Sequence, residues 1–269
     1  MANRDARDDA AGAKLVPADR ANSYVLRLDG HDQSYVDLDD PTRLVFDYVR
    51  RMGDVLDTLG TPGAALRVAH VGGAAMTLPR YVAATRPRST QVVLEPAEAL
   101  TALVRAELPL PARSGIKVRP LDGRSGLVGL RDGAFDAVVV DAYAKGQVPA
   151  DLVTVEAVAE IARVLTPEGL VLFNLSDRAP FAWTRRVIAA VRTQLPRVMV
   201  SAEPATLRAR RGGNLLLVAS RSGLPESALL ERAARSASPY KVLGAAAVSD
   251  ALGGGNAFTD ADTEASPRP

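Results

Sequence analysis

The sequence predicts an α/β fold built on a mostly parallel sheet of seven strands that ends in an antiparallel hairpin. Three observations carry this prediction. Short apolar runs alternate with amphipathic stretches from residue 66 onward, a pair of glycines (Gly72 and Gly73) follows the first run, and the last two runs have no helical pattern between them. Alternation of this kind is typical of parallel sheets covered by helices, whereas strands connected without a helix are typical of antiparallel pairing.

Composition narrows the class of protein. The chain has 269 residues, 47% of them hydrophobic, which is enough for a substantial core. Lys and Arg total 33 against 31 Asp and Glu, and this near balance of charge argues against nucleic acid as a partner. Without cysteine and with two histidines, the chain has few ligands for a metal. No apolar run reaches the ~18 residues of a membrane span, and no secretory signal is recognisable, so we expect a cytoplasmic protein without a membrane partner.

Four segments are expected along the chain. Residues 1–21 are polar and are expected to form a disordered arm. Residues 22–62 contain a small β-hairpin around an Asp-Gly turn and then an amphipathic helix. Residues 63–221 form a Rossmann-like core, and residues 222–269 form a C-terminal extension whose final part is expected to be disordered.

Each element is predicted from its own pattern. Strands are short apolar runs with polar or glycine neighbours, and helices repeat apolar residues every three or four positions. The run 135–140 is apolar almost throughout, which fits a strand covered on both faces. In chain order we expect hairpin strands at 24–28 and 34–38, a helix at 42–59, a strand at 66–71, a helix at 77–84, a strand at 91–94, a helix at 96–108, strands at 116–118 and 135–140, a helix at 153–165, a strand at 170–175, a helix at 182–195, strands at 198–201 and 215–219, and a helix at 227–234.

Acidic residues follow three of the predicted parallel strands. Ligands of such sheets bind beyond the carboxyl ends of the strands, so these acids and the glycine pair form the candidate site. Glu95 has the spacing to accept hydrogen bonds from ribose hydroxyls, and Asp122, followed by Gly123, is a candidate acceptor for an adenine amino group. Asp141 follows the most apolar strand and would lie over the reactive end of the ligand.

Each of these positions has a structural alternative. Acids favour helix N-termini, so the alternative role for Glu95 and Asp122 is to cap the helices that follow them. The alternative role of the glycine pair is to form a tight turn between a strand and a helix. The alternative for Asp141 is an ordinary loop residue at the end of a strand. His70 lies inside the first predicted strand, where packing in the core is the favoured interpretation.

The order of these motifs resembles the spermidine synthase-like aminopropyltransferases. That family combines a glycine-rich loop, an acid after the second strand, a triplet similar to Asp-Gly-Arg, and a strand that ends on a catalytic acid; the corresponding residues here are Gly72-Gly73, Glu95, Asp122-Gly123-Arg124 and 135–141. The resemblance implies the class I methyltransferase fold. It also implies transfer of an aminopropyl group from decarboxylated S-adenosylmethionine to a small-molecule amine, and a homodimer.

The resemblance further implies roles for individual residues. Asp141 matches the catalytic aspartate, which orients the acceptor amine and receives its proton. The cofactor-binding residues would be Gly72, Gly73, Glu95, Asp122 and Gly123, and the substrate-binding residues would be Gln33, Tyr35 and Tyr143.

Two departures from the family pattern leave other functions open. Ala144 stands where the family has a second substrate-binding aspartate, and Lys145 adds a positive charge to the same loop. Because like charges repel, a dicationic acceptor such as putrescine is disfavoured. A methyltransferase that uses intact S-adenosylmethionine and a non-catalytic binding module therefore stand as alternatives.

Overall fold

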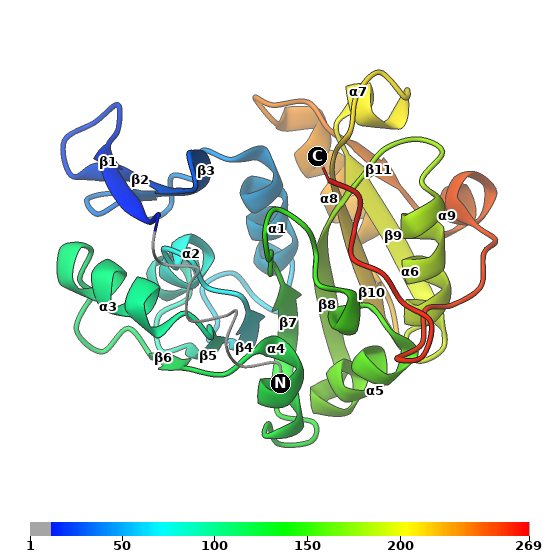
Figure 1. Cartoon of the computed structure of the whole chain (residues 1–269), viewed down its shortest axis with the longest axis horizontal. Helices are drawn as coiled ribbons and strands as arrows, with labels where there is room; N and C mark the ends of the chain where they lie inside the picture. The colour runs from blue at the N-terminus through cyan, green and yellow to red at the C-terminus, as the bar shows by residue number, and fades with distance from the viewer. Residues whose placement is uncertain (1–11, 269) are drawn as a thin grey trace.

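The computed structural model describes residues 12–268, which form a large mixed sheet flanked by helices and a small antiparallel sheet beside it (Figure 1). The large sheet has the strand order β11-β9-β10-β8-β7-β4-β5-β6. Strands β6, β5, β4, β7 and β8 run parallel, and β10, β9 and β11 continue the sheet in antiparallel pairing. Its members are β4 (Arg67–Val71), β5 (Thr90–Leu94), β6 (Ile116–Arg119), β7 (Phe135–Val140), β8 (Leu165–Asp177), β9 (Arg197–Ala202), β10 (Gly213–Ser220) and β11 (Lys241–Leu243).

Helices cover both faces of this sheet, and the core has two layers accordingly. Successive side chains of β7 face opposite ways: Val138 and Val140 pack in one apolar cluster with α5 and α6, and Val139 packs in the other with α1 and α2. The helices are α1 (Asp47–Asp57), α2 (Thr77–Thr85), α3 (Glu98–Glu107), α4 (Gly123–Val128), α5 (Val155–Val164), α6 (Ala182–Arg192), α7 (Pro204–Leu207), α8 (Glu226–Arg235) and α9 (Ala245–Leu252), with a 3₁₀ turn η2 (Ala150–Leu152).

The structure corrects several predicted elements. The sheet has eight strands because β11 pairs with the outer edge of β9. β8 begins at residue 165, five residues before the predicted start, and a one-turn helix, α7, separates β9 from β10, where no helix was expected. The first long helix begins at Asp47 and not at residue 42, because the Asp40 carboxylate accepts hydrogen bonds from the Thr42 amide and hydroxyl and holds that segment in a turn.

The N-terminal hairpin is part of a three-stranded sheet of β1 (Lys14–Pro17), β2 (Ser23–Leu28) and β3 (His31–Asp37). The expected disordered arm is therefore wrong over residues 14–17, and its residues 1–11 lie outside the described part of the chain. The sheet contacts the loop that follows β4. Ser34 Oγ accepts a hydrogen bond from the Ala75 amide at 3.5 Å, and Thr77 Oγ1 donates to the Tyr35 carbonyl at 2.8 Å.

The C-terminal extension is also more ordered than the sequence suggested. After α8, β11 and α9, residues 253–268 pack against the core, and the side chains of Phe258 and Ser266 are fully buried. The Phe258 ring lies 6.0 Å from that of Trp183 on α6. The prediction of disorder at this end is thus wrong for the described residues.

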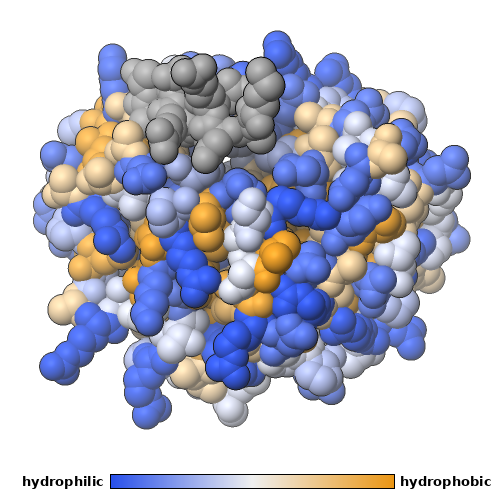
Figure 2. Space-filling view, turned by 60° about the horizontal axis from the view of Figure 1, so that its bottom comes forward, coloured by the Kyte–Doolittle hydropathy of each residue, from blue (hydrophilic) through white to orange (hydrophobic). Residues whose placement is uncertain are grey.

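The surface shown in Figure 2 is mainly hydrophilic, with hydrophobic residues scattered among the polar ones. Among residues 12–268, none of the helices combines the length and apolar character needed to cross a membrane.

Candidate active site

The loop after β4 approaches the end of β7 so closely that only glycine fits at its start. Gly72 has a φ of 89°, and a Cβ there would overlap the carbonyl oxygen of Asp141. The Asp141 amide donates to the Val71 carbonyl at 2.9 Å, and the Gly72 amide donates to the Leu94 carbonyl at 2.9 Å. The ends of three neighbouring parallel strands are therefore joined at this point.

Glu95 braces the glycine loop. Its Oε2 accepts hydrogen bonds from the amides of Gly73 (3.0 Å) and Ala74 (3.2 Å), and its Oε1 accepts from the Ala97 amide (3.0 Å) just before α3. Gly73 is also restricted to glycine, since a Cβ would crowd Val93. Ala97 is the residue before the first turn of α3, and no amide of that turn bonds to Glu95, so the capping role considered from the sequence is not seen here; the ribose role of Glu95 stays a prediction.

Asp122 and Gly123 form the start of α4. The Asp122 carboxylate caps the helix: Oδ1 accepts from the Ser125 amide at 2.8 Å and Oδ2 from the Ser125 hydroxyl at 2.8 Å. A Cβ at Gly123 would overlap the side chain of Val71, so glycine lets α4 pack against β4. The helix-cap alternative thus has direct support at Asp122, and adenine recognition stays a prediction.

Asp141 is a partly buried carboxyl with a single side-chain donor. Its Oδ1 accepts a hydrogen bond from Asn174 Nδ2 at 2.8 Å. Burial raises the pKa of Asp141 to about 6, against the opposing effect of that hydrogen bond. Within residues 12–268 no cation pairs with this carboxylate. The group is arranged to receive a cationic or proton-donating ligand.

Through Asn174, this carboxyl joins a cluster of polar side chains. Tyr143 follows β7, and its hydroxyl donates to the Asn174 carbonyl on β8 at 3.2 Å. Asn214 on β10 donates from Nδ2 to Asn174 Oδ1 at 2.9 Å and to the Tyr143 hydroxyl at 3.3 Å. Burial, and secondarily the charge of Asp141, raise the pKa of Tyr143 above its usual range. Tyr143 is therefore a neutral polar group beside Asp141.

A buried arginine supports this amide network from behind. Arg51 on α1 donates to the carbonyl of Ser201 on β9 at 2.6 Å and to that of Asn214 on β10 at 3.2 Å. Burial lowers the pKa of Arg51 to about 10, so the guanidinium keeps its charge at neutral pH. Helix α1 thereby fixes the strand that carries Asn214.

Of the two substrate residues predicted from the hairpin, Gln33 is linked to this cluster through Tyr48. The Tyr48 hydroxyl donates to the Gln33 carbonyl at 3.4 Å. Burial raises the pKa of Tyr48 well above its usual value, and the negative charge of Asp141 contributes. Tyr48 was not among the residues predicted for the site, because its proximity to Asp141 depends on how α1 docks on the sheet.

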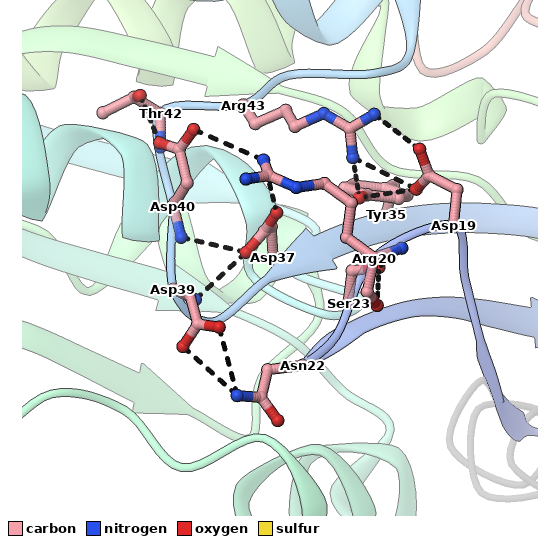
Figure 3. A network of polar contacts seen from close by, with 10 residues as sticks. All are labelled: Asp19, Arg20, Asn22, Ser23, Tyr35, Asp37, Asp39, Asp40, Thr42 and Arg43. Carbon is pink, nitrogen blue, oxygen red and sulfur yellow. Dashed lines mark hydrogen bonds and ion pairs between the residues drawn. The ribbon is translucent and has the colours of Figure 1, made fainter.

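Tyr35 is engaged elsewhere. Its hydroxyl donates to Asp19 Oδ1 at 2.9 Å and accepts from Arg43, whose guanidinium carbon lies 5.1 Å from the Tyr35 ring centre. Figure 3 shows the side chain among these partners, next to the turn in which Asp37 pairs with Arg20. The structure therefore places Tyr35 in the polar network of the N-terminal sheet and not in the Asp141 cluster.

The loop that carries Ala144 and Lys145 is a tight exposed turn. The amide of Ala144 donates to the Gln147 carbonyl at 2.9 Å, and the Gln147 amide donates back at 3.1 Å. Lys145 and Gly146 occupy the tip with φ angles of 51° and 76°. The Lys145 charge is solvated there, and no carboxylate stands at position 144.

His70 is a core residue, as its place in a strand suggested. It is buried, its Nε2 lies 2.9 Å from Gln91 Oε1, and burial lowers its pKa to about 4. In the part of the chain that the structure describes, no three His, Asp or Glu side chains converge in an arrangement able to hold a metal ion.

Comparison with known proteins places this geometry in context. No protein-family model matches the chain. A polyamine aminopropyltransferase from Chromobacterium violaceum is 29% identical over 143 residues, which span 53% of each chain, about half the length of that relative. A probable spermidine synthase from Corynebacterium glutamicum superposes with a TM-score of 0.83 and 25% identity over 92% of each chain. Human methyltransferase-like protein 13, solved in complex with SAH, gives a TM-score of 0.58 and 20% identity over 80% of this chain and 96% of that one.

These similarities confirm two predictions made from the sequence. The fold is the methyltransferase-like α/β fold, with a mostly parallel sheet. The resemblance to spermidine synthase-like aminopropyltransferases is confirmed by the curated relative and by the similarity to the probable spermidine synthase.

Proposed function

We propose that the chain is an aminopropyltransferase-like enzyme that moves an aminopropyl group from decarboxylated S-adenosylmethionine to a small amine. The observation that carries the proposal is Asp141, a partly buried carboxyl at the end of β7, directly beside the glycine loop and without a cationic partner in the described residues. The similarity to a polyamine aminopropyltransferase supports the reaction class.

The chemistry needs positioning more than activation of a leaving group. The amine nitrogen attacks the aminopropyl carbon attached to the sulfonium, a C–N bond forms, and the C–S bond breaks with its electron pair going to sulfur, which gives methylthioadenosine. The attacking nitrogen must first give up a proton so that its lone pair is free. Formation of the C–N bond then makes that nitrogen an ammonium group without any further proton, and the proton that it gave up is finally released to water. Asp141 would hold the amine in line with the carbon and receive that proton.

We infer that the adenosine part lies across the ends of β4 and β5. Gly72 and Gly73 would let the ligand approach the backbone, Glu95 would accept from the ribose hydroxyls, and the start of α4 would border the adenine. Glu95 already binds three amides, but a carboxylate offers about four lone-pair positions and can accept a further donor.

The reaction is tested by incubating the protein with decarboxylated S-adenosylmethionine and a panel of mono-, di- and polyamines. Amine-dependent release of methylthioadenosine, together with an aminopropylated product, is expected. Absence of both across the panel, with a folded protein that binds the nucleotide, would contradict aminopropyl transfer.

Glu95→Ala is expected to weaken nucleotide affinity by about 1.5 to 3 kcal/mol, because a hydrogen bond to a charged group would be lost. The affinity is measured by calorimetric titration. Since the carboxylate also braces the glycine loop, Glu95→Gln serves as the matched variant: it keeps one acceptor oxygen for the loop amides and removes the charge. Unchanged affinity in a folded Glu95→Ala protein would leave Glu95 with its structural role alone, as an acceptor for the amides of Gly73, Ala74 and Ala97.

One observation favours a second candidate, a methyltransferase that uses intact S-adenosylmethionine. The turn after Tyr143 has Ala144 where a further carboxylate would help bind a dication, and intact cofactor carries a carboxylate of its own that a positive charge would hold. Arg124, beside Gly123, is a candidate for that charge, although it already pairs with Asp260 at 2.8 Å. Formation of S-adenosylhomocysteine in place of methylthioadenosine would identify this activity.

A non-catalytic binding module is the third possibility and would bind neither form of the cofactor. The cytoplasmic location expected from the sequence and the homodimer implied by the resemblance are likewise proposals. Light scattering of the purified protein tests the second of them.

A further inference from the structure

The last residues of the chain are bound to loops and helix starts that follow the carboxyl ends of the parallel strands, as the candidate site does. We call residues 256–268 the tail. In Figure 1 it is the red segment that follows α9 and runs past α6 and α5 towards the end of the chain. Phe258 anchors its beginning: the ring is fully buried, and the Arg186 guanidinium of α6 stacks over it at 4.0 Å. Further on, Trp183 Nε1 donates to the Glu264 carbonyl at 3.0 Å.

The first attachment to the site is made by Asp260. Its Oδ2 pairs with Arg124 Nη2 at 2.8 Å, and its Oδ1 accepts from the Thr154 hydroxyl at 2.7 Å. Thr154 is the N-cap of α5, and Arg124 directly follows Gly123 in the first turn of α4. One tail carboxylate therefore fixes the starts of α4 and α5, and the start of α4 borders the proposed nucleotide region.

The second attachment is made by Ser266 to the loop that carries the catalytic candidate. The Val148 amide donates to Ser266 Oγ at 2.9 Å, and the Ser266 amide donates to the Val148 carbonyl at 3.1 Å. The Gln147 side chain donates to the Ser266 carbonyl, and Ser266 itself is fully buried. Nearby, Thr263 Oγ1 donates to the Ala150 carbonyl at 2.9 Å.

The loop from 141 to 149 depends on these bonds for its position. Its own backbone bonds close only the turn between Ala144 and Gln147, and its first residue is held by Val71. The segment after the turn is fixed by Ser266 on one side and by the core through the buried Val148 side chain on the other. Removing the serine hydroxyl would leave the buried Val148 amide without its acceptor, which favours local opening of the loop.

We propose that the tail is a positioning strap for the active site, with Ser266 setting the loop of Asp141 and Tyr143 and Asp260 setting Arg124. Neither residue is placed to touch reacting atoms, so both act through the groups they hold. The inference rests on the proposed function only in treating Asp141 as catalytic. The strap itself is defined by contacts within the chain and is testable without any ligand.

The test is hydrogen exchange of the full chain, without ligand, for Ser266→Ala. The hydrogen-bonded amides of this loop, those of Ala144, Gln147 and Val148, are expected to exchange about tenfold faster, the equivalent of losing one hydrogen bond, while those of β8 and β7 keep their protection. Ser249→Ala is the control: it also removes a serine hydroxyl that accepts a hydrogen bond, but the donor is Arg192, away from the loop. Unchanged exchange in residues 142–148, or an equal rise across the whole sheet, would overturn the strap.

A second pair of variants tests the Asp260 attachment. Asp260→Asn and Asp262→Asn each remove one tail carboxylate, but Asp262 pairs with Arg186 on α6 and not with α4. Faster exchange of the α4 amides is expected in Asp260→Asn alone, and equal effects in both variants would contradict the assignment. If the protein turns over substrate, Ser266→Ala is expected to lower kcat and to leave nucleotide affinity unchanged. If the proposed reaction does not occur, the exchange experiment still tests the strap, because it uses no ligand.

Discussion

Replacing Asp141 by asparagine is expected to lower turnover about 10²- to 10⁴-fold while nucleotide affinity stays the same, because the variant loses the proton acceptor and keeps the shape of the side chain. Asparagine can still accept from Asn174 through its amide oxygen, so the network that includes Asn214 should persist. The comparison requires single-turnover rates together with calorimetric titration of the nucleotide.

Asp136→Asn is the matched control for this substitution. Asp136 lies on the same strand, β7, near its opposite end, where it pairs with Arg67 at 2.6 Å. The control is expected to keep full turnover. Wild-type turnover in Asp141→Asn would refute the catalytic assignment.

The pH dependence of the reaction gives Asp141 a signature. Burial raises its pKa to about 6, so the carboxylate that accepts the proton forms as the pH rises through that value. Turnover of the wild type should therefore increase between about pH 5 and 7, and the residual activity of Asp141→Asn should lack this step. The same raised pKa means that the folded state binds this proton more tightly than the unfolded chain. The contribution of Asp141 to stability accordingly falls as the pH rises from the unfolded pKa towards 6.

Gly72→Ala is expected to lower the free energy of unfolding by about 2 to 5 kcal/mol, the combined cost of a left-handed backbone and an overlap with fixed atoms. Gly72 has a φ of 89°, and the overlapping atom is the backbone oxygen of Asp141, which no side-chain rotation can move away. Urea unfolding measures the loss, and nucleotide titration should show that the site is disturbed as well.

Gly133→Ala separates the two contributions. Gly133 also has a positive φ, 59°, but no atom lies within 4 Å of a Cβ placed there. It should cost only about 1 to 2 kcal/mol, the backbone contribution alone. If Gly72→Ala and Gly133→Ala lower the free energy of unfolding by the same amount, the close approach between Gly72 after β4 and the Asp141 carbonyl after β7 is contradicted.

The sequence predicts the central strands and long helices well because burial on one or both faces leaves a periodic apolar pattern. It does not reveal α4 or β11. Helix α4 is six residues long, contains two glycines and starts from a cap, which is too short for a period to appear. β11 has three residues, only partly buried, and is defined by its pairing with β9. The tail is polar enough to suggest disorder, yet the single residues Phe258 and Ser266 anchor it.

Some residues of the candidate site could be predicted from the sequence, and others are brought together only by the fold. Position after a strand is enough to identify Asp141, Glu95 and the glycine pair. Asn174 and Asn214 come together only because β8 and β10 pair antiparallel, a contact between residues 40 apart. A polar residue inside an otherwise apolar strand is the signal that marks Asn174. For Tyr35, the family resemblance implied a place in the substrate site together with Gln33, but the partners Asp19 and Arg43 lie in the surrounding segments and fix its hydroxyl there.

The most direct test of the central claim is calorimetric titration of the purified chain with decarboxylated S-adenosylmethionine, intact S-adenosylmethionine and methylthioadenosine in parallel. Aminopropyl transfer predicts that the decarboxylated form binds more tightly than the intact one, by about tenfold or more, and that methylthioadenosine competes with it. Tighter binding of intact S-adenosylmethionine, or no binding of any of the three, would contradict the proposed function.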